Sequence, residues 1–204
     1  MLPSRLTQHR LEDTMAAELP EWMLPPRPSG WEADDLDNWP QAPRHTELID
    51  GALIFMVSPQ RNWHSRLVEN LTFSLRQAAP EGIEIAREMT IRLDKRSRPE
   101  PDVLAATVAY DPDRTRYLPD EVALVIEVVS EESADRDRSI KPFKYAQAGI
   151  PHFWRVEDEE GEPTVHVYEL DTVTRSYVPT GIHRDRLKVT VPFPVDIDLG
   201  ALTP

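Results

Sequence analysis

Val122-Ala123-Leu124-Val125-Ile126-Glu127-Val128-Val129 is a stretch in which seven apolar residues surround one carboxylate. A continuous apolar run of this length, rich in β-branched residues, predicts a central strand that is covered on both faces. A carboxylate buried in such a strand is costly unless it finds a partner or takes up a proton. Glu127 therefore needs a cation, a metal ion or a neighbouring acid that shares a proton with it. The alternative is an edge position, from which Glu127 faces water or pairs with an arginine.

Further polar groups lie on both sides of this strand in the sequence. Upstream, Pro101-Asp102-Val103 opens another short apolar run, although Pro-Asp is also a common turn dipeptide. Downstream, Lys141 lies at the start of a predicted helix. Hydrolysis of a phosphodiester commonly uses Mg²⁺, which takes oxygen ligands and needs only one or two protein carboxylates. Asp102, Glu127 and Lys141 form a suitable set if the two strands are neighbours, and the backbone carbonyl of Val128 can add a ligand.

The remaining pattern predicts both strands and helices. Leucines at helical spacing predict a helix over residues 62–78. A second helix is predicted over residues 139–148, because Pro142 fits only in a first turn and Gly149 is typical of a helix end. Asp50-Gly51 is a strong hairpin signal. Strands are predicted at residues 47–50, 52–57, 83–86, 89–93, 102–108, 122–129, 152–156, 165–170 and 176–178. The fold class is therefore a mixed α/β sheet with helices packed on it.

Residues 1–44 differ from the rest in holding seven prolines and three tryptophans. The prolines prevent regular structure after a possible short helix near residues 7–18. The tryptophans need a surface on which to pack. We therefore expect an N-terminal arm over residues 1–44, lying along the folded domain of residues 45–204 or along a sister subunit, and we predict a homodimer to which residues 15–44 of the arm contribute. The alternative is a floppy leader.

The net charge is −13, and it comes mainly from the two ends of the chain. This charge counts against tight non-specific DNA binding, which usually needs a basic surface. A local basic cleft stays compatible with it, and Arg92, Lys95, Arg96 and Arg98 can line one. The chain has no cysteine, which excludes disulfides and thiolate metal sites and fits the cytosol.

Charged side chains interrupt the N-terminus, and no apolar run approaches the length of a membrane span. We therefore expect a cytoplasmic protein with no signal peptide and no membrane partner.

Several short motifs follow one another in a fixed order. They are Glu47-Leu48-Ile49-Asp50-Gly51, Ser58-Pro59 with His64, Pro101-Asp102-Val103, Glu127-Val128-Val129-Ser130, and Asp137-Arg138 with Lys141, Tyr145, Ala148-Gly149-Ile150-Pro151 and Phe153-Trp154. In this set the chain resembles the Uma2 family of restriction-endonuclease-like proteins, a branch of the PD-(D/E)xK nuclease superfamily. The resemblance implies a restriction-endonuclease-like mixed β-sheet flanked by helices. It also implies a DNA endonuclease, a hydrolase that depends on Mg²⁺ or Mn²⁺ and that often needs two copies to cut two strands.

The chain departs from the usual superfamily motif at one position. The lysine of (D/E)xK would stand at position 129, where this chain has Val129. The resemblance implies that Lys141 on the following helix replaces it, with Lys144 in the same turn as a rival. Glu47 is either a third acid of the site or a strand-surface acid, and His64 either contacts phosphate or is a surface or capping histidine. The candidate catalytic residues are Asp102, Glu127, Lys141, Glu47 and His64, and the candidate metal ligands are Asp102, Glu127 and Val128.

A second class of function stays open, because a fold does not fix a function. In this alternative the chain is a catalytically weak or inactive nuclease fold that acts as a nucleic-acid or protein binding and assembly module. The Asp, Glu and Lys residues favour the nuclease, whereas the charge of −13 favours the module or a nuclease regulated by a partner. A divalent ion between Asp102 and Glu127 would discriminate between the two.

Overall fold

The computed structural model describes residues 20–56 and 60–203. The possible helix near residues 7–18 and the Ser58-Pro59 motif lie outside these residues. The helices are η1 (Glu21–Met23), η2 (Ala33–Asn38), α1 (Asn62–Ala78), η3 (Pro119–Glu121), η4 (Arg136–Ile140), α2 (Lys141–Ala148) and η5 (Gly200–Leu202). The strands are β1 (Thr46–Ile49), β2 (Ala52–Phe55), β3 (Glu84–Arg87), β4 (Thr90–Ile91), β5 (Val103–Ala106), β6 (Arg116–Tyr117), β7 (Val122–Val128), β8 (His152–Glu159), β9 (Glu162–Asp171), β10 (Ser176–His183), β11 (Arg186–Val189) and β12 (Val195–Asp198).

The main sheet has six strands in the order β10-β9-β8-β7-β5-β3. Strand β7 lies inside it, antiparallel to β5 and parallel to β8. The other neighbouring strands of this sheet are antiparallel to each other. The mixed α/β sheet and the central strand that the sequence predicts are therefore confirmed. The short strand β6 and the hairpin of β11 and β12 were not predicted.

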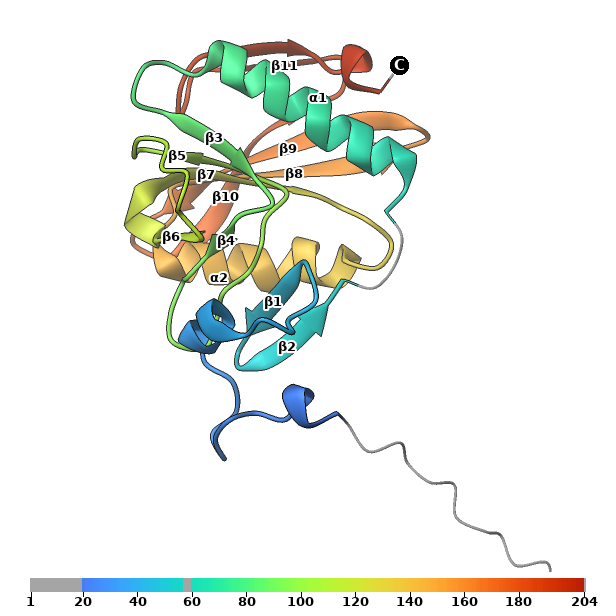
Figure 1. The fold of residues 1–204 in the computed structure, drawn as a ribbon. Coiled ribbons are helices and arrows are strands. Elements are labelled where there is room, and N and C mark those ends of the chain that lie inside the picture. Colours follow the sequence, from blue (N-terminus) through green and yellow to red (C-terminus); the bar gives the residue numbers. More distant parts are fainter. Residues whose placement is uncertain (1–19, 57–59, 204) are drawn as a thin grey trace, which may run out of the picture.

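The two faces of the sheet have separate apolar cores, because successive side chains of a strand point to opposite faces. Helix α1 covers one face, where its leucines pack against Ile126 and Trp154. Helix α2 covers the other face, where Tyr145 packs with Val125 and Phe153 (Figure 1). Position 127 has the same parity as position 125, so the Glu127 carboxylate points toward α2.

The connection from β7 to β8 positions the first turn of α2. Two parallel neighbours need a crossover, which here consists of the π-helix η4 followed by α2. Pro142 lies in the first turn of α2, and Gly149 ends the helix with a φ of 87°, as the sequence predicts. The crossover brings Lys141 to the first position of α2, beside the strand that carries Glu127.

The hairpin of β1 and β2 lies next to α2, and the described part of the arm packs on it (Figure 1). Trp31 stacks on Trp39 with ring centroids 4.6 Å apart. Trp31, with Ala33 and Leu48, forms a small separate core. The chain itself thus supplies a packing surface for the arm. None of the helices in the described ranges combines the length and the apolar character needed to cross a bilayer.

The four basic residues expected to line a cleft instead bind the arm, which corrects that expectation. Arg92 pairs with Asp34, and Lys95 pairs with Glu32. Arg98 is buried, and its guanidinium lies 2.7 Å from Asp37. Arg96 donates hydrogen bonds to the carbonyls of Ser29 and Asp50. The acidic side chains of η2 and its flank therefore neutralise this basic segment, because opposite charges in contact exclude a free basic surface there.

Candidate active site

Four charged side chains meet on the side of β7 that faces α2, and each is almost fully buried. The Lys141 ammonium lies 2.9 Å from Glu47 Oε1, 3.1 Å from Glu127 Oε2 and 3.4 Å from Asp137 Oδ1. The exposed fraction is 3% for Lys141 and 1% for each acid. Tyr145 donates a hydrogen bond of 2.6 Å to Glu127 Oε1. We call these five residues the lysine cluster; with all acids ionised it carries three negative charges and one positive charge.

Burial and the imbalance of charge together shift the pKa values in the lysine cluster. Burial raises the pKa of Glu127 well above its usual value, and Lys141 only partly opposes the effect. Burial also raises the pKa of Asp137, again against Lys141. For Lys141, burial lowers the pKa, but Glu127, Glu47 and Asp137 together raise it well above its usual value. Lys141 therefore stays an ammonium at neutral pH, and it acts as a hydrogen-bond donor and a charge, not as a base.

Asp102 belongs to a second group of polar atoms and directly precedes β5. Its Oδ2 accepts a 2.7 Å hydrogen bond from the backbone N–H of Val128. Its Oδ1 lies 3.2 Å from His64 Nε2, on the first turn of α1. Burial lowers the pKa of His64, but the hydrogen bond and charge of Asp102 and the Val128 carbonyl raise it overall. Asp102 therefore links the imidazole of His64 to the backbone of β7.

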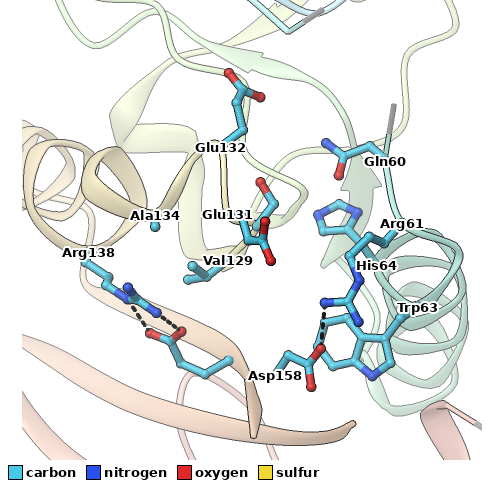
Figure 2. Close-up of a pocket in the computed structure, with 12 residues that line it drawn as sticks. Gln60, Arg61, Trp63, His64, Val129, Glu131, Glu132, Ala134, Arg138 and Asp158 are labelled. Carbon is cyan, nitrogen blue, oxygen red and sulfur yellow. Dashed lines mark hydrogen bonds and ion pairs between the residues drawn. The ribbon is translucent and has the colours of Figure 1, made fainter. Parts of the chain in front are cut away.

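Two cavities open beside these groups and share His64 in their walls. The larger, of about 580 Å³, lies between α1 and the segment that follows β7. Figure 2 shows His64 in its wall, with Val129 and Glu131 across from it, and with Arg61 and Arg138 each paired to an acid. The smaller, of about 130 Å³, is lined by seven titratable side chains: His45, Glu47, His64, Arg87, Glu88, Glu100 and Asp102. His64 thus borders both cavities, whereas Asp102 borders the smaller one.

The site fits a divalent cation by its charge and by its oxygen atoms. Glu47 Oε2 is buried and has no hydrogen-bond partner, although the side chain lines the smaller cavity. A buried oxygen without a partner needs an explanation, and a bound cation is one that suits a carboxylate. Within residues 20–56 and 60–203, no three His, Asp or Glu side chains gather as a preformed metal site. Mg²⁺ and similar ions keep several waters and need few protein ligands, so the residues present fit such an ion.

The predicted site residues fall into two adjoining groups. Glu47, Glu127 and Lys141 belong to the lysine cluster, whereas Asp102, the Val128 carbonyl and His64 form the second group. Lys144, the rival lysine, pairs with Asp50 at the hairpin turn, and within residues 20–56 and 60–203 it forms no ion pair with an acid of the lysine cluster.

Sequence reasoning did not select two members of the lysine cluster, Asp137 and Tyr145, as site residues. Both stand four positions from Lys141, the one before it and the other after it. Residues four apart on a helix share one face, so this spacing could have revealed them.

Comparison with solved structures identifies the class of the fold. A crystal structure described as a "putative nuclease belonging to DUF820 from Anabaena variabilis ATCC 29413" is similar to this chain with a TM-score of 0.65 and 16% sequence identity. The alignment covers 85% of this chain and 97% of the other. The fold is thus the restriction-endonuclease-like fold of nucleases, as the sequence predicts.

The family follows from the sequence itself. The model of Uma2, described as "Putative restriction endonuclease", matches residues 33–201. Since this range includes most of the chain, the protein belongs to the Uma2 family. None of the curated proteins matches the chain.

Proposed function

We propose that this chain is a metal-dependent DNA endonuclease that hydrolyses phosphodiester bonds. The observation that carries the proposal is the position of Lys141. Its ammonium lies 3.1 Å from Glu127, although it stands on a helix twelve positions beyond the place of the usual lysine. The family and the fold support a nuclease. The second group, with Asp102 bound to the backbone of β7, supplies a further acid at the same end of the sheet.

In the proposed site, Asp102, Glu127 and the Val128 carbonyl hold Mg²⁺ or Mn²⁺, which when bound supplies Lewis-acid stabilisation of the phosphate oxygens. Tyr145 fixes the orientation of Glu127 through its phenol, whose pKa is raised well above its usual value by burial and by Glu127. Lys141, held by three carboxylates, offers a permanent positive charge to the reacting phosphate. Such a fixed charge stabilises the transition state without reorganising during the reaction.

Cleavage of supercoiled plasmid DNA with Mg²⁺ or Mn²⁺ tests this proposal. We expect nicking by the parent chain and its loss in Glu127→Ala. Lys144→Ala is a matched control, because Lys144 lies one turn along the same helix but binds Asp50 at the hairpin turn. Cleavage by Glu127→Ala at the parent rate would contradict the proposal.

Metal binding provides an independent measurement. In calorimetric titrations, Asp102→Asn should abolish the binding of Mg²⁺ and Mn²⁺ that the parent chain shows. Unchanged binding by this variant would remove Asp102 from the metal site.

The alternative function, a weakly active or inactive module for binding and assembly, is favoured by one observation. The basic side chains near the arm are paired with acids, and Arg61 and Arg138 of the larger cavity are likewise paired. Such a surface offers little unpaired positive charge to a DNA backbone. DNA binding without cleavage, under conditions in which metal binds, would support the module.

The expected homodimer and the cytoplasmic location stay predictions. The described tryptophans of the arm pack within their own chain, so the dimer needs other support. Light scattering at micromolar concentration should give twice the mass of one chain. Cell fractionation tests the location.

A further inference from the structure

His64 stands between two groups that are both assigned to the proposed metal site. Its Nε2 lies 3.2 Å from Asp102 Oδ1, and Asp102 in turn accepts a 2.7 Å hydrogen bond from the backbone N–H of Val128. The residue is 8% exposed, so the imidazole is enclosed apart from the two cavities that it borders. The imidazole contacts the Asp102 carboxylate, which lies far from α1 in the sequence, so His64 does more than cap its own helix.

The separation of these atoms fits coordination of one ion. Two ligands at right angles, each about 2.1 Å from an octahedral ion, lie about 3.0 Å apart. The 3.2 Å between His64 Nε2 and Asp102 Oδ1 is close to that value. The imidazole also comes from the first turn of α1, and Leu67 and Val68 of the next turn anchor this helix to the sheet. The nitrogen is therefore held in place before an ion arrives.

We propose that His64 is a ligand of the divalent ion, together with Asp102 and the Val128 carbonyl, and that it makes the site prefer Mn²⁺ to Mg²⁺. The inference rests on the metal site of the proposed function and adds a nitrogen ligand to it. Mg²⁺ is a hard cation that selects oxygen ligands, whereas imidazole suits transition metals. One nitrogen among oxygen ligands therefore raises the affinity for Mn²⁺ more than the affinity for Mg²⁺.

Pulsed electron paramagnetic resonance of Mn²⁺ bound to the full chain tests the proposal directly. We expect nitrogen modulation in the parent chain, and we expect it to change in chain labelled with ¹⁵N-histidine. His64→Gln should remove the modulation. His45→Gln is the matched control, because His45 lines the same smaller cavity but pairs with Glu100, and it should keep the signal. The measurement on the parent chain does not depend on the folding of any variant.

Calorimetric titration with MnCl₂ and MgCl₂ gives the preference. His64→Gln should weaken Mn²⁺ binding roughly tenfold or more, as is usual when coordination is disturbed. It should change Mg²⁺ binding by less than about threefold, so that the preference disappears.

Two results would overturn this inference while leaving the proposed function in place. The first is Mn²⁺ binding that depends on Asp102 but shows no nitrogen modulation. The second is an equal gain of affinity for Mn²⁺ and Mg²⁺ in His64→Gln, which would mark His64 as a competitor for Asp102. Absence of any metal binding in the parent chain would overturn the proposed metal site as well.

Discussion

Two charged regions of this molecule are organised in opposite ways. At the arm, each acid of the segment 32–37 has a basic partner, and most of these pairs are partly exposed. In the lysine cluster, one ammonium serves three carboxylates, and all are buried. The first arrangement balances its charge, whereas the second leaves an excess of negative charge away from water.

The difference separates a structural role from a functional one. Balanced pairs at a surface hold a segment in place at little cost. Burial, helped by the neighbouring acids, raises the pKa of Glu127 and Asp137. The excess of buried negative charge weakens the fold unless a cation or a proton binds. Groups with perturbed pKa values that lie beside a cavity are typical of functional sites. Four predictions follow from the contrast, ordered by the size of the expected effect.

Replacing the single cation of the cluster should have the largest effect. Lys141→Met leaves three buried carboxylates without an ammonium, and removing one partner of a buried ion pair costs about 3 to 5 kcal/mol. Thermal unfolding in metal-free buffer measures this loss. Among the molecules that remain folded, cleavage should fall roughly 100-fold or more, since the charge at the phosphate is gone.

A second change controls for the loss of fold in that variant. Adding Glu47→Gln to Lys141→Met should recover part of the stability but none of the activity. If Lys141→Met cleaves like the parent chain, the nuclease proposal itself is contradicted. Lys141→Ala with Val129→Lys, which returns the lysine to the usual position, should recover part of the cleavage.

At the arm, the largest effect is expected for the buried member of its pairs. Arg98 donates hydrogen bonds to Asp37, to Thr90 and to the carbonyl of Ala33. Hydrogen bonds to charged groups contribute about 1.5 to 3 kcal/mol each, so Arg98→Ala should destabilise by about 2 to 3 kcal/mol. Denaturant titration measures the change. Cleavage by the folded fraction should be unaltered; a proportional loss of cleavage would show that the two regions are coupled.

Removing one acid of the lysine cluster should stabilise the metal-free protein. The folded pKa of Glu127 is raised, so the folded chain prefers the neutral acid, which Glu127→Gln imitates. We expect a gain of about 1 kcal/mol, or about 2 to 4 °C in Tm for a domain of this size.

The sign of the pH dependence checks the cause. Because the folded pKa lies above the unfolded value of about 4.3, the penalty of Glu127 grows as the pH rises above that value. The gain in Glu127→Gln should therefore be present at pH 8 and vanish at low pH. A lower Tm for the variant at pH 8 would instead make Glu127 a member of a stabilising ion pair.

The smallest effect is expected at an exposed pair of the arm. The Lys95 side chain is 71% exposed and lies 3.0 Å from Glu32. Exposed pairs contribute about 0.2 to 1 kcal/mol, and salt screens them. Lys95→Ala should therefore shift the Tm by no more than about 2 °C, with no shift at high salt. A larger change would mean that the balanced region is more than a set of surface pairs.

The elements of the fold follow largely from the chain, for local reasons. The boundaries of α1 agree with the leucine spacing, and the start and end of α2 follow from Pro142 and Gly149. The apolar run of β7 predicts a strand inside the sheet, because only burial on both faces allows such a run. The hairpin of β11 and β12 has no comparably strong pattern, and its strands are only four residues long each.

The sequence by itself indicated that Glu127 needs a partner if its strand is buried on both faces, because a buried carboxylate is costly unless it is paired. Only the tertiary structure decided which partner it has. The crossover between β7 and β8 brings Lys141 to it, the hairpin adds Glu47, and η4 adds Asp137. It also decided that the basic segment 92–98 pairs with acids of the arm. Charges far apart in the sequence meet only through the packing of the sheet, and no local sequence pattern predicts that packing.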